Sequence, residues 1–358
     1  MRIVNIILTS QNGGAEQVFI DYARILRDNL GHEVLAITRH DAPYVEELEQ
    51  LNIPLKKIKN NFGYHDIFAV KEITKILQEF NADAVIAHAG RSIILARKAI
   101  AKVKNKKIFE VAVNHSMNVK RSIGADVVLS VNRPMFFNTI DCGQSEDKSF
   151  IIHNATSISG AVAASPNLNL QDKEVITLGV IGRLDKAKGF RFAVKAIKLL
   201  ENHSSGKKFI LKIAGAGPEE VILRNLAKEL QVEDRVEFLG WIKDKKAFFD
   251  SIDIFLLTSR RETFGLVLLE AMKFFKPIIS CNADGPKEIL RNEIDGLLVN
   301  IEPMHDVEYR LVEAVEKIIN NPELANKMVK HSFTRLCDKF SFEALTERLK
   351  EVFGSDGK

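Results

Sequence analysis

The sequence is poor in cysteine, lacks a long apolar run and contains no internal repeat or low-complexity tract. Cys142, Cys281 and Cys337 lack the paired spacing of zinc and redox motifs, which excludes those sites and fits a reducing cytoplasm. The apolar run at residues 1–8 soon turns polar and is too short for a signal peptide or a membrane-spanning segment. We interpret it as a first β-strand.

A composition typical of disordered or fibrous proteins is also absent. Of the 358 residues, 46% are hydrophobic and 27% are charged. A chain of this length and composition can form two globular domains of ordinary size.

Acidic residues are missing from the stretch between Asp83 and Glu110. Seven basic residues fall within it: Arg91, Arg97, Lys98, Lys102, Lys104, Lys106 and Lys107. On a helix predicted over residues 91–103, Arg91, Lys98 and Lys102 would share one face. Such a face suggests an anionic partner, either a membrane surface or an acceptor. A solvated helix face followed by a basic turn explains the same residues equally well.

Short apolar runs suited to strands alternate with helical patterns along most of the chain. Strands are predicted at residues 3–8, 33–38, 84–88, 107–113, 126–131 and 150–153, and again at residues 175–181, 209–214, 236–238, 252–257, 277–281 and 296–299. This alternation indicates parallel βαβ units with helices on both faces of each sheet.

A segment rich in Ser, Ala, Asn and Pro, residues 157–172, separates the two series like an interdomain linker. We therefore predict an α/β protein with two Rossmann-like, doubly wound domains, one at residues 1–165 and one at residues 172–340. Residues 307–353 have no strand pattern and are predicted to be helical. The last helix, within residues 341–358, needs an apolar surface to cover.

The segment E-T-F-G-L-V-L-L-E, from Glu262 to Glu270, changes from polar to apolar between two carboxylates. A strand pattern precedes it and Gly265 opens a helical one, so Glu262 is expected in a loop and Glu270 on a helix. In an open α/β sheet such a loop faces the ligand crevice. A carboxylate there can accept hydrogen bonds from two ribose hydroxyls. Alternatively, Glu270 pairs with Arg260 or Arg261 and Glu262 is a solvated or capping residue.

A basic turn, G-R-L-D-K-A-K-G at residues 182–189, lies between a predicted strand and a predicted helix. Arg183 and Lys188 can neutralise a diphosphate there without a divalent metal. If each cation strengthened its contact by ~2 kcal/mol as a diphosphate left, the pair would raise the rate roughly a thousandfold. A merely hydrated basic loop is the alternative.

Glycine-bearing turns recur where predicted strands lead into helices. They are G-G-A-E at residues 13–16, G-A-G-P at residues 215–218 and G-P at residues 285–286. The glycines permit close approach of a ligand, and Pro218 favours the first position of a helix. For residues 285–286, plain helix initiation is favoured. One such turn is weak evidence, but their recurrence in both domains predicts ligand-binding sheet edges.

Together these motifs resemble those of a family 4 retaining glycosyltransferase of the GT-B fold. The matching elements are G-G-A-E, A-H-A-G-R at residues 87–91, I-I-H-N-A at residues 151–155, G-R-L-D-K-A-K-G, I-A-G-A-G-P, F-L-G-W and E-T-F-G-L-V-L-L-E, and they span nearly the whole chain. The resemblance implies two Rossmann-like domains facing a central cleft, with the C-terminal helix returning to the N-terminal domain. It also implies a nucleotide diphosphate sugar as substrate, with no cofactor and no metal.

The resemblance assigns roles to particular residues. The implied donor-binding residues are Gly14, Arg183, Lys188, Gly215, Gly217, Glu262, Phe264, Gly265, Leu266 and Glu270. Among them, Arg183 and Lys188 would bind the diphosphate, Glu270 the ribose and Glu262 the transferred sugar. Residues 264–266 would offer backbone N–H groups to phosphate or sugar.

The implied catalytic residues are Glu262, His115, Arg183 and Lys188. His115, in V-A-V-N-H-S, is the best-placed histidine to lie beside the donor sugar, while structural roles are favoured for His88 and His153. The resemblance implies retention of configuration with the leaving phosphate as the base, so no nucleophilic carboxylate is assigned. Residues 12–14, 61–65 and 116–121 are candidates for acceptor contacts by position.

We therefore expect an enzyme that transfers a hexosyl group to a glycolipid, lipopolysaccharide or polysaccharide precursor. It is expected in the cytoplasm, peripheral to the cytoplasmic face of the membrane, with Arg91, Lys98 and Lys102 toward an anionic surface and no nucleic-acid partner. Two alternatives stay open. One is a non-catalytic partner of another transferase that binds a nucleotide or a membrane, and the other is a sugar-nucleotide epimerase or hydrolase on the same fold.

Overall fold

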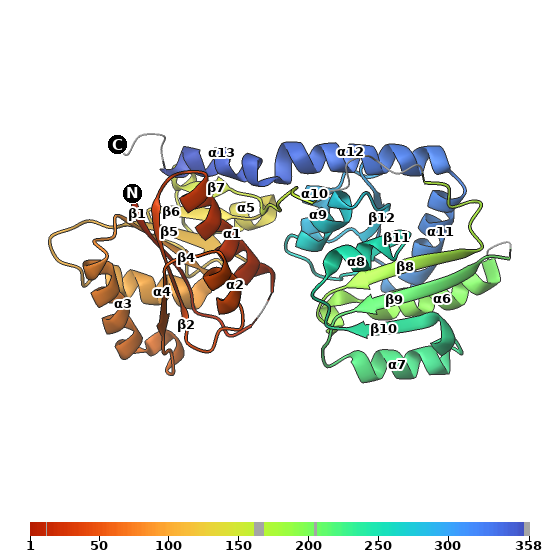
Figure 1. Ribbon diagram of the computed structural model, residues 1–358, viewed down its shortest axis with the longest axis horizontal. Helices are drawn as coiled ribbons and strands as arrows, with labels where there is room; N and C mark the ends of the chain where they lie inside the picture. The colour runs from red at the N-terminus through yellow and green to blue at the C-terminus, as the bar shows by residue number, and fades with distance from the viewer. Residues whose placement is uncertain (12, 161–167, 204–205, 354–358) are drawn as a thin grey trace. The chain divides into compact units, whose positions relative to one another are not determined.

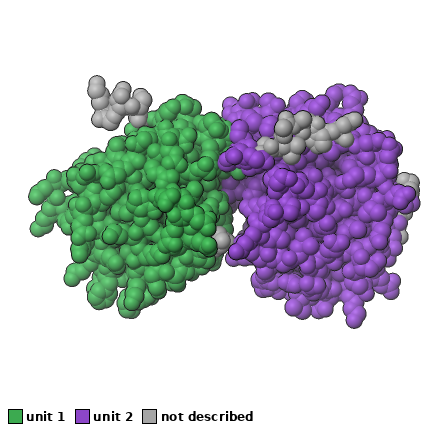
Figure 2. Space-filling view, in the orientation of Figure 1, with its two compact units in different colours: residues 1–156, 341–358 green, residues 157–340 purple. Residues whose placement is uncertain are grey.

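The computed structural model describes residues 1–11, 13–160, 168–203 and 206–353. The chain divides into two compact units: unit 1 contains Met1–Thr156 and Ser341–Lys358, and unit 2 contains Ser157–Phe340 (Figures 1 and 2). The predicted domain boundary at residue 165 and part of the predicted linker lie outside the described residues.

Unit 1 is built on a seven-stranded sheet in the order β3-β2-β1-β4-β5-β6-β7. Its strands are β1 (Arg2–Ile7), β2 (Glu33–Arg39), β3 (Leu55–Ile58), β4 (Ala84–His88), β5 (Phe109–Asn114), β6 (Val127–Ser130) and β7 (Ser149–Ile151). All neighbouring strands pair in parallel. The central strands are almost wholly buried, which matches their continuous apolar sequence.

Helices cover the sheet of unit 1 (Figure 1). They are α1 (Gly14–Asp28), α2 (Val45–Gln50), α3 (Ile67–Glu79), α4 (Ala89–Ile100), α5 (Arg133–Asp141) and α13 (Phe342–Phe353), with 3₁₀ turns η1 (Gly63–His65) and η2 (Glu146–Lys148). Helices α3 and α4 pack beside each other over a core that includes Val4, Ile6 and Val85. Helix α13 contacts α1, where the Arg24 guanidinium lies over the Phe342 ring.

Unit 2 has a six-stranded parallel sheet in the order β10-β9-β8-β11-β12-β13. The strands are β8 (Val175–Ile181), β9 (Lys208–Ala214), β10 (Val236–Gly240), β11 (Ile254–Leu257), β12 (Ile278–Cys281) and β13 (Leu297–Val299). The helices are α6 (Phe190–His203), α7 (Glu220–Glu229), α8 (Lys245–Asp250), α9 (Leu266–Lys273), α10 (Asp284–Ile289), α11 (Val307–Ile319) and α12 (Pro322–Phe340), with 3₁₀ turns η3 (Lys186–Lys188), η4 (Glu233–Arg235) and η5 (Met304–Asp306). Helices α6 and α11 pack together, and both contribute to an apolar core that includes Val194, Ile197 and Leu311.

The predicted α/β architecture of two parallel, doubly wound sheets is confirmed, and the twelve predicted strands all occur within a few residues of their expected bounds. Strand β3 was not predicted. It lies at the edge of its sheet and reads L-K-K-I with both lysines exposed, so it lacks the apolar signal of the central strands.

The predicted helix over residues 91–103 is wrong at its C-terminal end. Helix α4 begins at Ala89 and ends at Ile100, so Lys102 lies beyond the helix. After Ile100 the helical bonds give way to a tighter turn, in which Lys102 N donates to Ala99 O and Val103 N to Ile100 O, both at 3.0 Å. Arg91 and Lys98 remain on α4, but the predicted three-residue basic helix face does not form.

No helix in the described part of the chain is both long and apolar enough to cross a bilayer.

Candidate active site

The loops that leave β8 and β11 meet at the carboxyl edge of the unit 2 sheet. These two strands are neighbours at the point where strand order reverses, with β9 on one side of β8 and β11 on the other. The loops bond directly, because Arg260 N donates to Ala187 O at 2.7 Å and Thr258 Oγ1 donates to Lys188 O at 2.9 Å. In open α/β sheets such a reversal point forms a ligand crevice.

An ion pair joins these two loops. Lys188 Nζ lies 2.6 Å from Glu262 Oε2, and Ser259 Oγ lies 3.3 Å from the same oxygen. Both charged side chains are largely shielded from solvent, with 26% of Lys188 and 14% of Glu262 exposed. Glu262 therefore occupies the position beside Lys188 Nζ that a phosphate oxygen could take when a ligand binds.

Arg183 lies in the same basic turn and is far more accessible. Its side chain is 64% exposed, and its Nε donates to Asp185 Oδ2 at 2.9 Å. Asp185 also accepts hydrogen bonds from the backbone N–H groups of Ala187 and Lys188, so it fixes the turn. Arg183 can therefore swing toward a ligand without disturbing the backbone that carries Lys188.

The glycines of the G-A-G-P turn make the close packing of loops possible. A Cβ atom at Gly215 would overlap the carbonyl oxygen of Gly182, and one at Gly217 would overlap that of Leu184. Leu184 N also donates to Ala216 O at 2.9 Å. The close approach seen at these glycines is thus between two protein loops.

The E-T-F-G-L-V-L-L-E segment folds as expected, with Glu262 in the loop and Glu270 on α9. Gly265 precedes the helix with φ of 99°, a conformation that side chains other than glycine rarely adopt. Phe264 is buried and its ring packs edge-on against Phe340. Leu266 is the first residue of α9, so the N–H groups of this turn begin the helix.

Glu270 has a partner that the sequence did not indicate. Lys245 Nζ bonds to Glu270 Oε1, whereas the alternative partners considered were Arg260 and Arg261. Lys245 follows the N-cap Asp244 on the short helix α8, far from Glu270 in the chain. No spacing rule links positions on two separate helices, so this pairing needed the fold.

In unit 1, His88 and His115 stack at the carboxyl ends of β4 and β5. Their rings lie 5.2 Å apart, and His88 Nδ1 and His115 Nε2 share a hydrogen bond of 3.0 Å. Phe19 and Tyr22 press their edges against His88, which is fully buried. Burial, with repulsion from His115, holds the pKa of His88 well below its usual value, and burial lowers the pKa of His115 to about 4. Both rings are therefore neutral at pH 7.

Two predicted site residues, Gly14 and His115, belong to unit 1, and the other predicted site residues belong to unit 2. Gly14 is exposed and begins α1, next to Gly13 as N-cap. Of the acceptor-side candidates, residue 12 lies outside the described residues. Segments 61–65 and 116–121 come together, because the Arg121 guanidinium lies 4.5 Å from the centre of the Tyr64 ring.

The basic stretch between Asp83 and Glu110 has carboxylates close to it in the folded protein. The two carboxylates that bound it pair with two of its cations: Arg97 with Glu110 at 2.9 Å, and Lys106 with Asp83 at 2.7 Å. Parallel pairing of β4 with β5 places the start of both strands side by side, which sequence distance conceals. Lys98 donates to Tyr64 O at 3.0 Å and Lys102 is exposed.

The described residues contain no group of three or more His, Cys, Asp or Glu side chains arranged to hold a metal ion.

Comparison with known proteins identifies the class. Residues 12–159 match the family model "Glycosyltransferase Family 4", and residues 164–335 match "Glycosyl transferases group 1". The chain is therefore a glycosyltransferase with the GT-B fold, and it belongs to this family of two-domain glycosyltransferases.

Individual relatives cover the chain almost completely. It is 28% identical to an uncharacterised glycosyltransferase of Haemophilus influenzae over 95% of this chain and 96% of that protein. It is 24% identical to the lipopolysaccharide core biosynthesis glycosyltransferase LpsD of Rhizobium meliloti, over 99% of this chain and 98% of that one. Among solved structures, Anabaena HepE in complex with UDP and glucose superposes with a TM-score of 0.84 at 19% identity, over 99% of this chain and 100% of that chain.

Proposed function

We propose that this glycosyltransferase is a retaining enzyme that moves a hexosyl group from a nucleotide diphosphate sugar to a glycolipid, lipopolysaccharide or polysaccharide precursor. The observation that carries the proposal is the meeting of the Lys188 and Glu262 loops at the strand-order reversal of the unit 2 sheet. The lipopolysaccharide role of the similar LpsD supports the class of acceptor.

The donor would be held by groups that are already in place. The leaving diphosphate carries negative charge that Lys188 and Arg183 can neutralise, while Glu262 turns from its lysine to the hydroxyls of the sugar. Glu270, fixed by Lys245, would accept hydrogen bonds from the ribose. Exchange of the Lys188–Glu262 pair for two ligand contacts keeps both charges satisfied when the donor binds.

The proton would pass from the acceptor hydroxyl to the leaving phosphate. A neutral His115 suits this scheme, because its Nε2 is engaged with His88 while Nδ1 has no hydrogen bond in the described residues. In that state it can orient a hydroxyl without competing for the proton. The family resemblance supports retention of configuration, and NMR of the anomeric proton in the product tests it directly.

We propose that the reaction needs no metal. Two cations in one turn, Arg183 and Lys188, offer the charge that a divalent ion would otherwise supply to the diphosphate. Full turnover in excess EDTA supports this, and activity that returns only on addition of a divalent cation contradicts it.

We propose that unit 1 binds an anionic membrane surface. Phe62, Ile67 and Phe68 are 64%, 65% and 66% exposed beside each other at the start of α3, and the rings of Phe62 and Phe68 lie 6.4 Å apart. Exposed Lys98 reaches the same loop through its bond to Tyr64 O. Large apolar side chains beside lysines fit the headgroup region of an anionic bilayer.

Vesicle sedimentation tests this membrane role. Wild-type protein is expected to sediment with anionic vesicles at low salt more than with neutral ones, and Phe62→Ser with Phe68→Ser to reduce the bound fraction. Exposed Val221 on α7 of unit 2 provides a control, since Val221→Ser removes an apolar side chain away from this surface. Equal sedimentation with both vesicle types rules the membrane role out.

The enzyme itself is tested with a panel of nucleotides. Thermal shift with UDP, GDP and ADP identifies the base, because a ligand that binds the folded state raises its stability. Turnover of the matching sugar nucleotides with saccharide acceptors then distinguishes a transferase from a non-catalytic partner or an epimerase. Nucleotide binding without transfer or hydrolysis across a broad acceptor panel contradicts the proposed activity.

A further inference from the structure

A second cationic site lies at the strand-order reversal of unit 1. In that sheet β1 has β2 on one side and β4 on the other. The loops after β1 and β4 therefore lie where open α/β sheets bind their ligands. Arg91 is in the first turn of α4, directly after β4, and its Nη1 lies 3.4 Å from Leu8 O at the end of β1. Arg91 therefore lies at the reversal point itself, between the carboxyl ends of β1 and β4.

Three side chains from separate segments of the chain come together there, namely Tyr64, Arg91 and Arg121. The guanidinium carbons of Arg121 and Arg91 lie 4.5 Å and 5.9 Å from the centre of the Tyr64 ring. Tyr64 comes from the loop after β3 and Arg121 from the loop after β5. All three are partly buried. The face of one ring attracts each cation modestly, but it does not neutralise their charge.

Neither arginine has a counter-charge among the described residues. In the part of the chain that the structure describes, no carboxylate lies within ion-pair distance of Arg91 or Arg121, although Arg97 on the same helix is paired with Glu110. Two like charges held against one ring repel each other, and an anion between them would remove that cost.

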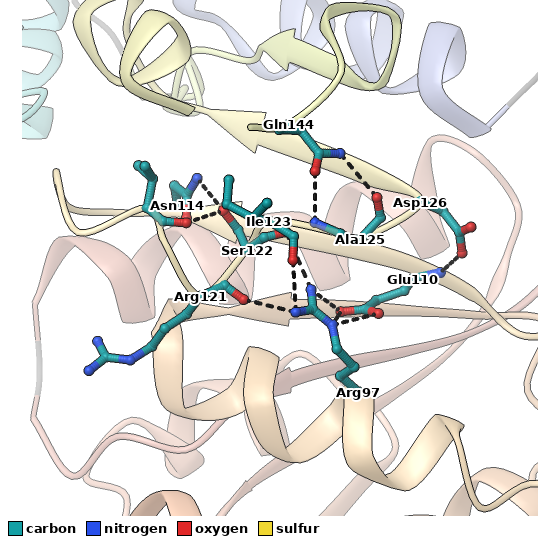
Figure 3. Close-up of polar contacts among 11 residues, drawn as sticks. Arg97, Glu110, Asn114, Arg121, Ser122, Ile123, Ala125, Asp126 and Gln144 are labelled. Carbon is teal, nitrogen blue, oxygen red and sulfur yellow. Dashed lines mark hydrogen bonds and ion pairs between the residues drawn. The ribbon is translucent and has the colours of Figure 1, made fainter. Parts of the chain in front are cut away.

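The loop that carries Arg121 is rigidly positioned. Arg97 donates to the carbonyls of Arg121 at 3.2 Å, Ser122 at 3.3 Å and Ile123 at 2.9 Å while it pairs with Glu110. Gln144 binds the next turn through Gly124 N and Ala125 O. Figure 3 shows these contacts and the Arg121 side chain pointing away from them. The backbone carbonyls of this loop are therefore occupied by the network, whereas the Arg121 guanidinium takes no part in it.

The partners of Arg121 are equally constrained. Buried Asp66 accepts hydrogen bonds from the backbone N–H groups of Asn61, Phe62, Phe68 and Ala69, which fixes the loop that carries Tyr64. Burial alone would raise the pKa of Asp66, but these four bonds hold it below its usual value. A Cβ atom at Gly90 would lie only 2.6 Å from Arg121 Cδ, so the glycine leaves room for the arginine to lie across α4.

We propose that Arg91 and Arg121, stacked on Tyr64, form a subsite for a phosphate group of the acceptor. A phosphate ester carries up to two negative charges and several acceptor oxygens, which suits two guanidinium forks. A neutral saccharide would leave both charges unmatched. The inference rests on the proposed function, since it assigns acceptor binding to unit 1, and it selects acceptors that carry a phosphate group.

The test uses the full-length protein with its donor site filled by a saturating concentration of the nucleoside diphosphate that stabilises it most. Inorganic phosphate, hexyl phosphate and hexanol are titrated by calorimetry against wild type, Arg91→Gln/Arg121→Gln and Lys120→Gln. Lys120 is an exposed cation next to Arg121 in the same loop and serves as the matched control. Arg121→Lys keeps the charge but removes the fork.

We expect wild type to bind phosphate and hexyl phosphate at least tenfold more tightly than hexanol, the double variant to lose about tenfold or more, and Lys120→Gln to stay within twofold. The phosphate affinity of Arg121→Lys should lie between those of wild type and the double variant. If inorganic phosphate and hexyl phosphate bind with equal affinity, the ligand is a free phosphate. If hexyl phosphate binds more tightly, the ligand is a lipid-linked phosphate. Wild-type affinity in the double variant, or no preference for phosphate over hexanol, overturns the subsite.

Failure of this inference can be separated from failure of the proposed function. The double variant should keep the wild-type nucleotide affinity, because Arg91 and Arg121 lie in unit 1, whereas Lys188→Ala should lose nucleotide but keep hexyl phosphate binding. If no nucleotide binds wild type, the proposed function fails, and the phosphate titration without nucleotide still decides the subsite. If the double variant does not fold, Arg121→Gln alone is measured.

Discussion

The two sheets present cations at equivalent edges but treat their charge in opposite ways. At the reversal point of unit 2, Lys188 is held by the Glu262 carboxylate. At the reversal point of unit 1, Arg91 and Arg121 have an aromatic ring and no carboxylate among the described residues. The comparison teaches that a shared strand order does not fix the chemistry of a site, because the loop sequences decide which charges are balanced before a ligand arrives.

The largest effect is expected from Lys188. Lys188→Ala removes the cation nearest Glu262 and leaves that carboxylate unpaired, so transfer should fall about a hundredfold or more. Lys186→Ala changes an exposed lysine in the same turn and should stay within twofold of wild type. Steady-state kcat/KM for both variants checks the prediction, and equal activities would remove Lys188 from the donor site.

Next in size is the network beneath the unit 1 site. Arg97→Gln should lower the free energy of unfolding by ~2 kcal/mol, because Glu110 is only 9% exposed and would lose its partner. Lys106→Gln breaks the more exposed pair with Asp83 and should cost less than about 1 kcal/mol. Urea denaturation measures the loss of unfolding free energy in each variant. Equal losses would show that the Arg97 contacts stabilise the fold no more than the exposed Lys106–Asp83 pair does.

The neutral histidines predict how unit 1 responds to acid. The pKa of His115 is about 4 in the folded state and about 6.5 when unfolded, so the unfolded chain gains protons first as the pH falls. The stability that neutral His115 contributes is therefore full above about pH 6.5 and is lost progressively as the pH falls toward 4. His115→Asn should flatten this decline in thermal melts between pH 7 and pH 4.5. An unchanged pH slope would mean that His115 is already accessible to protons.

The smallest effect concerns the second carboxylate of unit 2. Glu270→Gln keeps the shape of the side chain but removes its charge, and nucleotide affinity should fall about tenfold if two ribose hydroxyls bond to it. Lys245→Ala should weaken binding less, since it only positions Glu270. Titration calorimetry with the preferred nucleoside diphosphate separates the two, and no change in Glu270→Gln would leave the carboxylate a structural role.

Much of the architecture was predictable because apolar runs report buried strands directly. The twelve predicted strands belong to the sheets, and Glu262 and Glu270 lie on the loop and helix expected from their segment. Edge strand β3 could not be predicted, since its lysines face solvent. Pairing across the chain was equally hidden: Lys245 reaches Glu270, and Arg121 reaches Tyr64, through folding that no local spacing encodes.

The basic stretch between Asp83 and Glu110 also shows that ion pairing cannot be predicted from residue spacing. Counted along the sequence it looked like one cationic face, but Arg97 and Lys106 are paired with the two acids that flank the stretch, and α4 ends before Lys102. Of the remaining cations, Arg91 lies at the strand-order reversal, and Lys98 contacts the loop that carries exposed Phe62. Composition thus predicts attraction to an anion, and the fold provides two separate places, at Arg91 and at Lys98, where an anion could bind.

Hydrogen–deuterium exchange with the preferred nucleoside diphosphate tests the central claim most directly. If the donor binds where the Lys188 and Glu262 loops meet, backbone amides at residues 183–189 and 262–266 of unit 2 will be protected, while residues 61–65 and 116–121 of unit 1 exchange as before. Protection confined to the unit 1 loops, with none at residues 183–189, would contradict the account.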